Sequence, residues 1–249
     1  MITDPWFYLA AVPAVLITGM SKGGFGGIAL LAVPLLALVI SPIQAAGIML
    51  PILLFMDAQS VWEFRGTYDK RNLIILLPGA MLGILVGGLT AQFINDDIIR
   101  LIVGTIAIVF TVHFFVKGRF ARAVNNPRAS IGVILGASSG FTSFLAHAGA
   151  PTFQLYMLPQ KLDRRIYAGT AVIFFAAVNF VKLVPYSMLG LLQPTNLWTS
   201  LVLFPLAWVG VKLGVWANKR LSNEIFYRII YTAIFLVGLM LFWQVLGAG

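Results

Sequence analysis

Two glycine-rich stretches of the chain hold most of the polar side chains that could bind a small molecule. Residues 19–27 read GMSKGGFGG and residues 136–151 read GASSGFTSFLAHAGAP, and each stretch lies within a long apolar run. Hydroxyl groups, the N–H groups of broken helix ends and one lysine are donors that suit a small oxyanion. The candidate substrate-binding residues are Ser21, Lys22, Gly23, Gly24, Ser138, Ser139, Thr142, Ser143 and His147.

Three more polar residues, Asp57, Asn179 and Lys182, lie within other apolar runs. Ionisable side chains at membrane depth pair with one another or line a pathway. We therefore expect Asp57 to take part in proton or sodium coupling. Lys182, close to Asn179 in the sequence, is expected to be the partner of Asp57 or a second contact for the anion. Structural pairing of Asp57 and Lys182 is the alternative.

Each candidate also has an interpretation that involves no substrate. The serine and threonine hydroxyls could bond to helix carbonyls or pack between helices. Lys22 could extend along a short helix toward the interface. His147 is either a packed, hydrogen-bonded histidine or a proton carrier.

Catalysis is a further alternative, because residues 19–23 and 136–140 both spell G-x-S-x-G. This is the pattern of the nucleophile elbow in hydrolases, which requires a preceding strand that the sequence does not predict. A serine–histidine dyad within a membrane would need His113 or His147 to reach Ser21 or Ser138. The motif's occurrence at two matching positions favours a structural turn. We expect no catalytic residues and no enzyme, with an intramembrane serine hydrolase as the alternative.

The composition indicates an all-α polytopic membrane protein. Hydrophobic residues make up 60% of the 249 residues and charged residues only 10%, whereas soluble domains average about 25% charged residues. The net charge of +9 comes from basic residues clustered in short connections, a pattern that orients a membrane protein and does not indicate nucleic-acid binding. With no cysteine and two histidines, we expect no disulfide, metal site or cofactor.

Six apolar runs have the length of about 20 residues that crosses a bilayer. They are residues 43–62, 72–93, 98–117, 166–189, 197–217 and 225–246. Two other runs, 6–40 and 129–158, are interrupted by the glycine-rich stretches, which leave arms of roughly 13 residues or fewer. We expect these runs to be re-entrant hairpins of two half-helices, with two packed full spans as the alternative.

The basic connections predict the orientation in the membrane. Lys and Arg cluster near 65–71, 117–128, 161–165 and 219–220, which the positive-inside rule assigns to the cytoplasm. Both chain ends are then outside. This assignment requires each of the two interrupted runs to leave from and return to the same side.

An internal repeat relates the two halves of the chain. Six residues between Gly19 and Pro42 match residues 117 positions later, and six between Pro78 and Thr105 match residues 127 positions later. The repeats are 1–117 and 129–249, joined by a basic connection at 118–128. Each contains one hairpin and three spans, and because three is odd their topologies are inverted. Inverted repeats with broken helices are typical of secondary transporters that work by alternating access.

The inverted halves, GMSKGGFGG, its counterpart GASSGFTS and the basic central connection resemble the TauE/SafE family of sulfite exporters and organosulfonate permeases. The resemblance covers nearly the whole chain. It implies transport of sulfite, a sulfonate or a similar anion across a bacterial cytoplasmic (inner) membrane. A carrier for another small organic or inorganic anion is the alternative. Lys22 has Ser139, not a lysine, at the matching position of the second repeat.

Overall fold

The computed structural model describes residues 1–25, 29, 32–117 and 127–220, with scattered positions from 232 to 246. In these ranges the chain forms helices and no strand. Most of the expected span at 225–246 and most of the connection at 118–128 lie outside the described residues.

The elements follow the expected runs closely. In the first half they are α1 (Pro5–Met20), η1 (Ser21–Phe25), α2 (Ala32–Ala37), α3 (Pro42–Phe64), α4 (Lys70–Thr90), η3 (Ala91–Phe93) and α5 (Asp96–Lys117). In the second half they are α6 (Ala129–Ala146), α7 (Ala150–Met157), η4 (Leu158–Gln160), α8 (Arg164–Met188) and α9 (Pro194–Arg220).

Side-chain caps fix where several helices begin. An N-cap side chain accepts a hydrogen bond from a backbone N–H group in the first turn, which would otherwise lack a partner. Such caps precede α1, α3, α4 and α8, and α1 and α3 also begin with proline, which has no N–H group to satisfy. The capping residues are Asp4, Ser41, Asp69 and Asp163.

Five described helices are long and apolar enough to cross a membrane. They are Pro42–Phe64, Lys70–Thr90, Ala129–Ala146, Arg165–Met188 and Pro194–Gly214. Large apolar side chains on their outer faces are exposed, among them Leu89 at 63%, Phe180 at 68% and Trp208 at 51%. In a bilayer such side chains contact lipid. A helix can face the hydrocarbon because its backbone N–H and C=O groups are satisfied within the helix. The expectation of an all-α, multi-pass membrane protein is confirmed.

Two interruptions divide the helices within the predicted glycine-rich stretches, and the second lies near the end of its stretch, residues 136–151. After α1, residues Ser21–Phe25 form a π-helical turn. In the second half, α6 continues through the first eleven residues of the glycine-rich stretch to Ala146, and the chain turns at His147, which has a left-handed φ of 52°. The expected short first arm is therefore wrong, because α6 has 18 residues. The G-x-S-x-G motif at 136–140 is helical and is not a turn.

The glycines of this motif allow two helices to pack with their backbones in contact. A Cβ atom built on Gly140 would lie 2.1 Å from the Ala80 carbonyl oxygen, and one on Gly83 would lie 2.0 Å from the Ala137 carbonyl oxygen. We call this contact between α4 and α6 the first glycine seam. Small residues drive such close packing in membranes.

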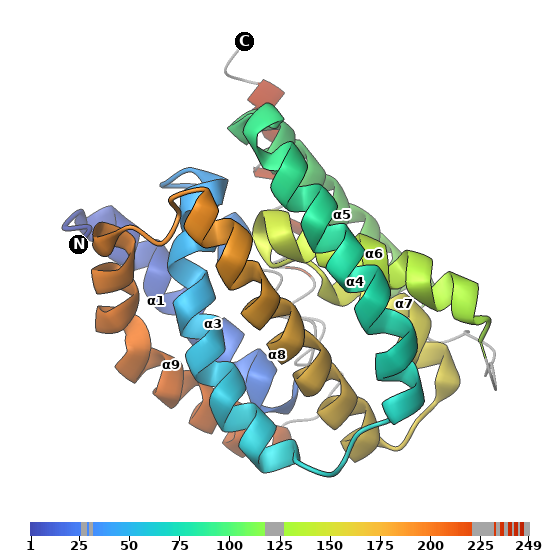
Figure 1. Ribbon diagram of the computed structural model, residues 1–249. Helices are drawn as coiled ribbons and strands as arrows, with labels where there is room; N and C mark the ends of the chain where they lie inside the picture. Colours follow the sequence, from blue (N-terminus) through green and yellow to red (C-terminus); the bar gives the residue numbers. More distant parts are fainter. Residues whose placement is uncertain are drawn as a thin grey trace.

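A second glycine seam joins α1 to α9. A Cβ atom on Gly19 would lie 2.7 Å from the backbone of Gly210, and one on Gly214 would lie 2.5 Å from the Met20 carbonyl oxygen. In both seams a helix of one half packs against a helix of the other half. Between the two seams, α3 and α8 contact each other in the middle of the molecule (Figure 1).

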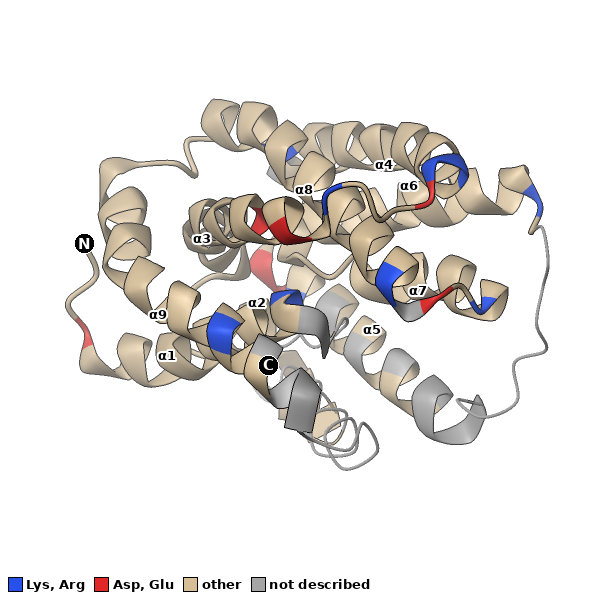
Figure 2. Ribbon diagram, turned by 90° about the horizontal axis from the view of Figure 1, so that it is seen from below, with Lys and Arg blue, Asp and Glu red and all other residues tan. Residues whose placement is uncertain are grey.

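At one end of the molecule, hydrogen bonds bring two basic connections together. The backbone N–H group of Asp69, before α4, donates to Thr170 Oγ1 of α8 at 2.8 Å. The side-chain amides of Asn72 and Gln160 exchange hydrogen bonds of 2.9 and 3.1 Å. The connections near 65–71 and 161–165 therefore lie at the same end, which is viewed in Figure 2. Most of the described ribbon in this view carries neither acidic nor basic residues.

At the other end, the start of the chain meets the start of α9. The backbone N–H group of Ile2 donates to Thr199 Oγ1 at 3.0 Å, and Gln44 Nε2 donates to Asn196 Oδ1 at 3.4 Å. The segments at this end, 1–5, 41–43 and 190–196, contain no Lys or Arg. The described connections are thus sorted by charge between the two ends.

Candidate functional site

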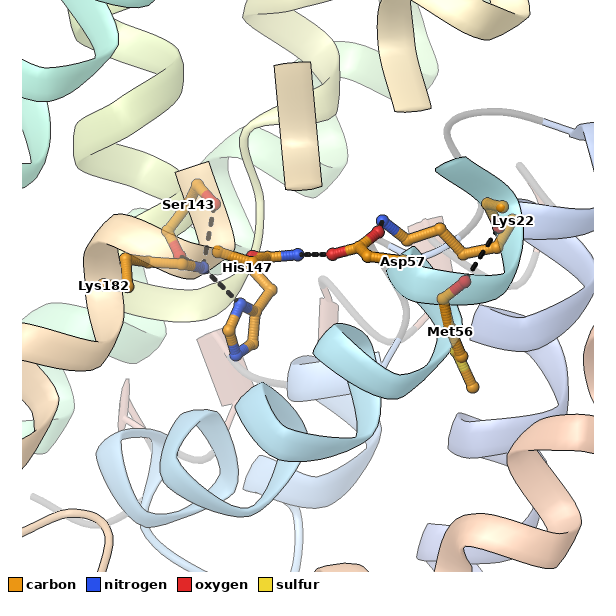
Figure 3. Close-up of polar contacts among 8 residues, drawn as sticks. Lys22, Met56, Asp57, Ser143, His147 and Lys182 are labelled. Atoms are coloured by element: carbon orange, nitrogen blue, oxygen red, sulfur yellow. Dashed lines mark hydrogen bonds and ion pairs between the residues drawn. The ribbon is translucent and has the colours of Figure 1, made fainter. Parts of the chain in front are cut away.

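An ion pair between Lys22 and Asp57 lies beside the first helix break. The π-helical turn that follows α1 positions Lys22, and its Nζ contacts Asp57 Oδ1 on α3 (Figure 3). The Asp57 side chain is 2% exposed and that of Lys22 is 11% exposed. Asp57 is the only acidic side chain among the buried residues of the described part of the chain.

The second carboxylate oxygen of Asp57 also has a donor. Asn179 Nδ2, on α8, donates to Asp57 Oδ2 at 2.6 Å. Each oxygen therefore accepts a charged or polar N–H group, as a buried carboxylate requires. The ion-pair partner of Asp57 is Lys22, and not Lys182 as one interpretation of the sequence held.

Lys182 lies on the same helix as Asn179 but makes a different set of contacts. Its Nζ donates to the carbonyl oxygen and hydroxyl of Ser143, at 3.0 and 3.1 Å, and lies 2.6 Å from His147 Nδ1 (Figure 3). The Lys182 side chain is fully buried. All three of these contacts are with uncharged acceptors, and their number matches the three N–H groups of an ammonium.

The second helix break holds His147 in one tautomer. Its Nε2 lies 2.9 Å from the Ala46 carbonyl oxygen, which can only accept a hydrogen bond. Nε2 therefore carries the proton, and the Nδ1 that faces Lys182 is an acceptor. His147 is thus a neutral, hydrogen-bonded histidine in this arrangement. The proton-carrier role stays a prediction.

These residues form one buried cluster with more positive than negative charge. We define the central cluster as Lys22, Asp57, Ser143, His147, Asn179 and Lys182. With both lysines protonated it holds two cations and one carboxylate. Burying a charge without an opposite charge is unfavourable in a low-dielectric environment. In that protonation state Lys182 has no opposite charge of its own among the residues of the central cluster.

Aromatic rings border both lysines. Lys22 Nζ lies 5.8 Å from the centre of the Phe175 ring, and Lys182 Nζ lies 5.9 Å from that of Tyr186. The Tyr186 hydroxyl donates to the Phe144 carbonyl oxygen at 2.5 Å. Rings at this distance interact favourably with a lysine ammonium group.

Three further hydroxyls predicted for the site bond to backbone carbonyls. Ser138 Oγ donates to Ile134 O at 3.0 Å, and Thr142 Oγ1 donates to Ser138 O at 2.8 Å within α6. Ser139 Oγ donates to Gly149 O at 2.8 Å and so ties α6 to the second break. These bonds match the packing alternative for the three hydroxyls.

Three other predicted residues lie in the π-helical turn with Lys22. Ser21 and Gly23 are buried there, and Gly24 belongs to the same turn. Their sequence spacing therefore places them at the break, next to the central cluster.

Sequence reasoning missed three groups that complete this arrangement. The Ala46 carbonyl that orients His147 is a backbone atom, so no side-chain signal could have indicated it. Tyr186 follows Lys182 by four residues on α8, a spacing that puts both side chains on one helix face. This spacing was a sequence signal that could have identified Tyr186. Phe175, an aromatic residue in an apolar run, carried no distinguishing signal.

Among the described residues, His147 does not form the serine–histidine dyad that the hydrolase alternative would require. Ser138 Oγ is bonded to its own helix, and the two ring nitrogens of His147 face Lys182 and Ala46. The His113 side chain lies outside the described part of the chain. Among the described residues, no group of three or more His, Asp or Glu residues could hold a metal ion.

Comparison with known proteins matches most of the chain to a family model. Residues 11–241 match the family model described as Sulfite exporter TauE/SafE. The curated protein "Probable membrane transporter protein YunE" of Bacillus subtilis (strain 168) is 20% identical over 233 residues, which cover 82% of each chain. No solved structure matches the chain significantly.

Proposed function

Because the chain belongs to the TauE/SafE sulfite exporter family of membrane transporters, we propose that it is a secondary transporter of sulfite, an organosulfonate or a similar small anion. The family is one of transporters, so the chain is a multi-pass membrane transporter and not an enzyme. Its substrate is a small molecule. We further propose that it resides in the cytoplasmic membrane.

The observation that carries the anion assignment is the near-complete burial of two lysine side chains beside a single carboxylate in the central cluster. Lys182 is fully buried, and the acceptors around it are uncharged. A sulfonate or sulfite oxygen is a charged acceptor, and hydrogen bonds to charged acceptors are roughly twice as strong as those to neutral ones. An anion that replaced one of these neutral acceptors would therefore gain both charge compensation and a stronger hydrogen bond.

The packing of the helices supports an inverted repeat with the site between its halves. In the repeat, α1 corresponds to α6, α3 to α8 and α4 to α9. The contact of α1 with α9 therefore corresponds to that of α6 with α4, and the contact of α3 with α9 corresponds to that of α8 with α4. All four contacts occur. Asp57 on α3 and Lys182 on α8 come from opposite repeats. Rocking of repeat 1–117 against repeat 129–249 would open this site to either side in turn.

Thermal unfolding of the purified protein tests the substrate class. A ligand that binds only the folded state raises stability by mass action, by about 2.7 kcal/mol at a concentration of 100 times its Kd. We expect sulfite and ethanesulfonate to raise the unfolding temperature, and the uncharged analogue dimethyl sulfone to leave it unchanged.

Two lysine variants test whether stabilisation by the anions depends on Lys182. Lys182→Met retains the length of the side chain but removes the buried charge, and we expect it to abolish stabilisation by the anions. Lys212→Met is the matched control, since Lys212 is exposed and lies over the Trp208 ring. A folded wild-type protein that no sulfur oxyanion stabilises would contradict the proposed function. Stabilisation by a carboxylate alone would point to the other small-anion class.

A further inference from the structure

The central cluster contains one ion pair that is already compensated. Lys22 and Asp57 contact each other directly, and Asn179 donates to the remaining carboxylate oxygen. This Lys22–Asp57 pair contributes no net charge when both groups are ionised. The unmatched charge of the cluster is therefore that of Lys182.

Other ionisable groups do not alter this balance within the described residues. His147 is neutral in the tautomer that its two contacts define. The helices that pack on α3 add none at this depth: residues 5–20, 129–146 and 101–112 of α1, α6 and α5 contain no Asp, Glu, Lys, Arg or His. On α9, the Lys212 side chain is exposed and lies over Trp208.

We propose that the site selects anions by charge and takes those that carry a single negative charge. This inference rests on the proposed function. With one such charge bound beside Lys182, the central cluster is neutral. A second negative charge would have no partner, because the Asp57 carboxylate already neutralises Lys22. Asp57 is thus a specificity-determining residue, and the preferred substrates are alkanesulfonates and hydrogen sulfite over sulfate and the sulfite dianion.

The cost of a second charge is large enough to discriminate. Two unit charges about 5 Å apart interact by roughly 3 kcal/mol at an effective dielectric constant of 20, which corresponds to more than 100-fold in affinity. Solvent and relaxation reduce this, so we expect at least about a tenfold preference.

Ethanesulfonate and sulfate are suitable probes, since both present S–O groups and differ in charge. Binding to the purified full-length protein is measured by calorimetry at constant ionic strength. We expect ethanesulfonate to bind the wild-type protein at least about tenfold more tightly than sulfate. Asp57→Asn leaves both lysines without a carboxylate, and we expect it to shift the preference at least about tenfold toward sulfate.

Two further variants make the test specific. Asp97→Asn makes the same chemical change in the exposed pair of Asp97 with Arg100, and should leave the preference unchanged. The double variant of Lys22→Met with Asp57→Asn removes the pair as a unit and restores the wild-type charge. We expect it to prefer ethanesulfonate again, which also tests the idea if Asp57→Asn alone fails to fold.

The outcomes separate this inference from the proposed function. If sulfate binds the wild-type protein as tightly as ethanesulfonate, or if folded Asp57→Asn keeps the wild-type preference, charge selection by Asp57 is wrong and the transporter function stands. Loss of all anion binding in the folded double variant would show that Lys22 contacts the anion directly. The inference that the Lys22–Asp57 pair only neutralises itself would then be wrong. If neither anion binds any folded form, the proposed function fails.

Discussion

At the scale of single residues, Tyr186 supports the second helix break through a hydrogen bond to the end of α6. Its fully buried hydroxyl donates to the Phe144 carbonyl, near the end of α6, where carbonyls lack partners within the helix. Tyr186→Phe would leave this buried acceptor without its donor. We expect the variant to lose about 1–3 kcal/mol of unfolding free energy, measured by denaturation in detergent micelles.

Tyr8→Phe is the matched control for Tyr186. The Tyr8 hydroxyl donates to Ile2 O, which lies near the start of the chain and is only part-buried. A water molecule can replace a donor there, so the loss should be smaller. Equal losses in the two variants would show that the Phe144 carbonyl does not depend on Tyr186.

The sequence identified the members of the central cluster more readily than their contacts. Charged residues inside apolar runs are conspicuous, so Lys22, Asp57 and Lys182 stood out as candidates. The ion pair joins residues 35 positions apart, and Asn179 lies 122 positions from Asp57. Which lysine meets the carboxylate depends on the path of the chain through the first break, and local sequence patterns do not encode that path.

At the scale of the elements, the first glycine seam determines how closely α4 and α6 approach. We expect Gly83→Ala to push the helices apart and to lower stability by about 1–3 kcal/mol, because the added methyl group would meet the Ala137 carbonyl. Thermal unfolding of the purified protein measures the effect. Gly88→Ala on the same helix is the control, since its Cβ would lie 3.2 Å from a Pro185 side-chain atom. Equal losses of stability in the two variants would show that the close backbone contact at Gly83 does not determine the effect.

The helices were predictable because apolar runs of about 20 residues leave few alternatives to a spanning helix. The first arm of the second run is longer than predicted for a physical reason. Glycine and serine weaken a helix in water, so the whole stretch 136–151 was expected to interrupt the helix. In the folded protein Gly136 and Gly140 face α4, and tertiary packing outweighs their poor helix propensity.

At the scale of the whole molecule, the separation of charge between the two ends makes the orientation testable. The sequence contains no cysteine, so single cysteines report without background. Tyr68 and Gln193 are exposed at the basic end and the uncharged end respectively. We expect a membrane-impermeant maleimide to label Gln193→Cys in intact cells and Tyr68→Cys only after permeabilisation. The reverse pattern would contradict the assignment of the basic end to the cytoplasm.

The second glycine seam has a consequence for biogenesis. Gly19 of α1 packs on Gly210 of α9, which the ribosome adds about 190 residues later, or about 10–40 s later at common translation rates. Until then the glycine face of α1 is without its native neighbour and must be covered by lipid or by the insertion machinery. A chain whose translation stopped before α9 would keep that face open, and cellular quality control could recognise the truncated product by it.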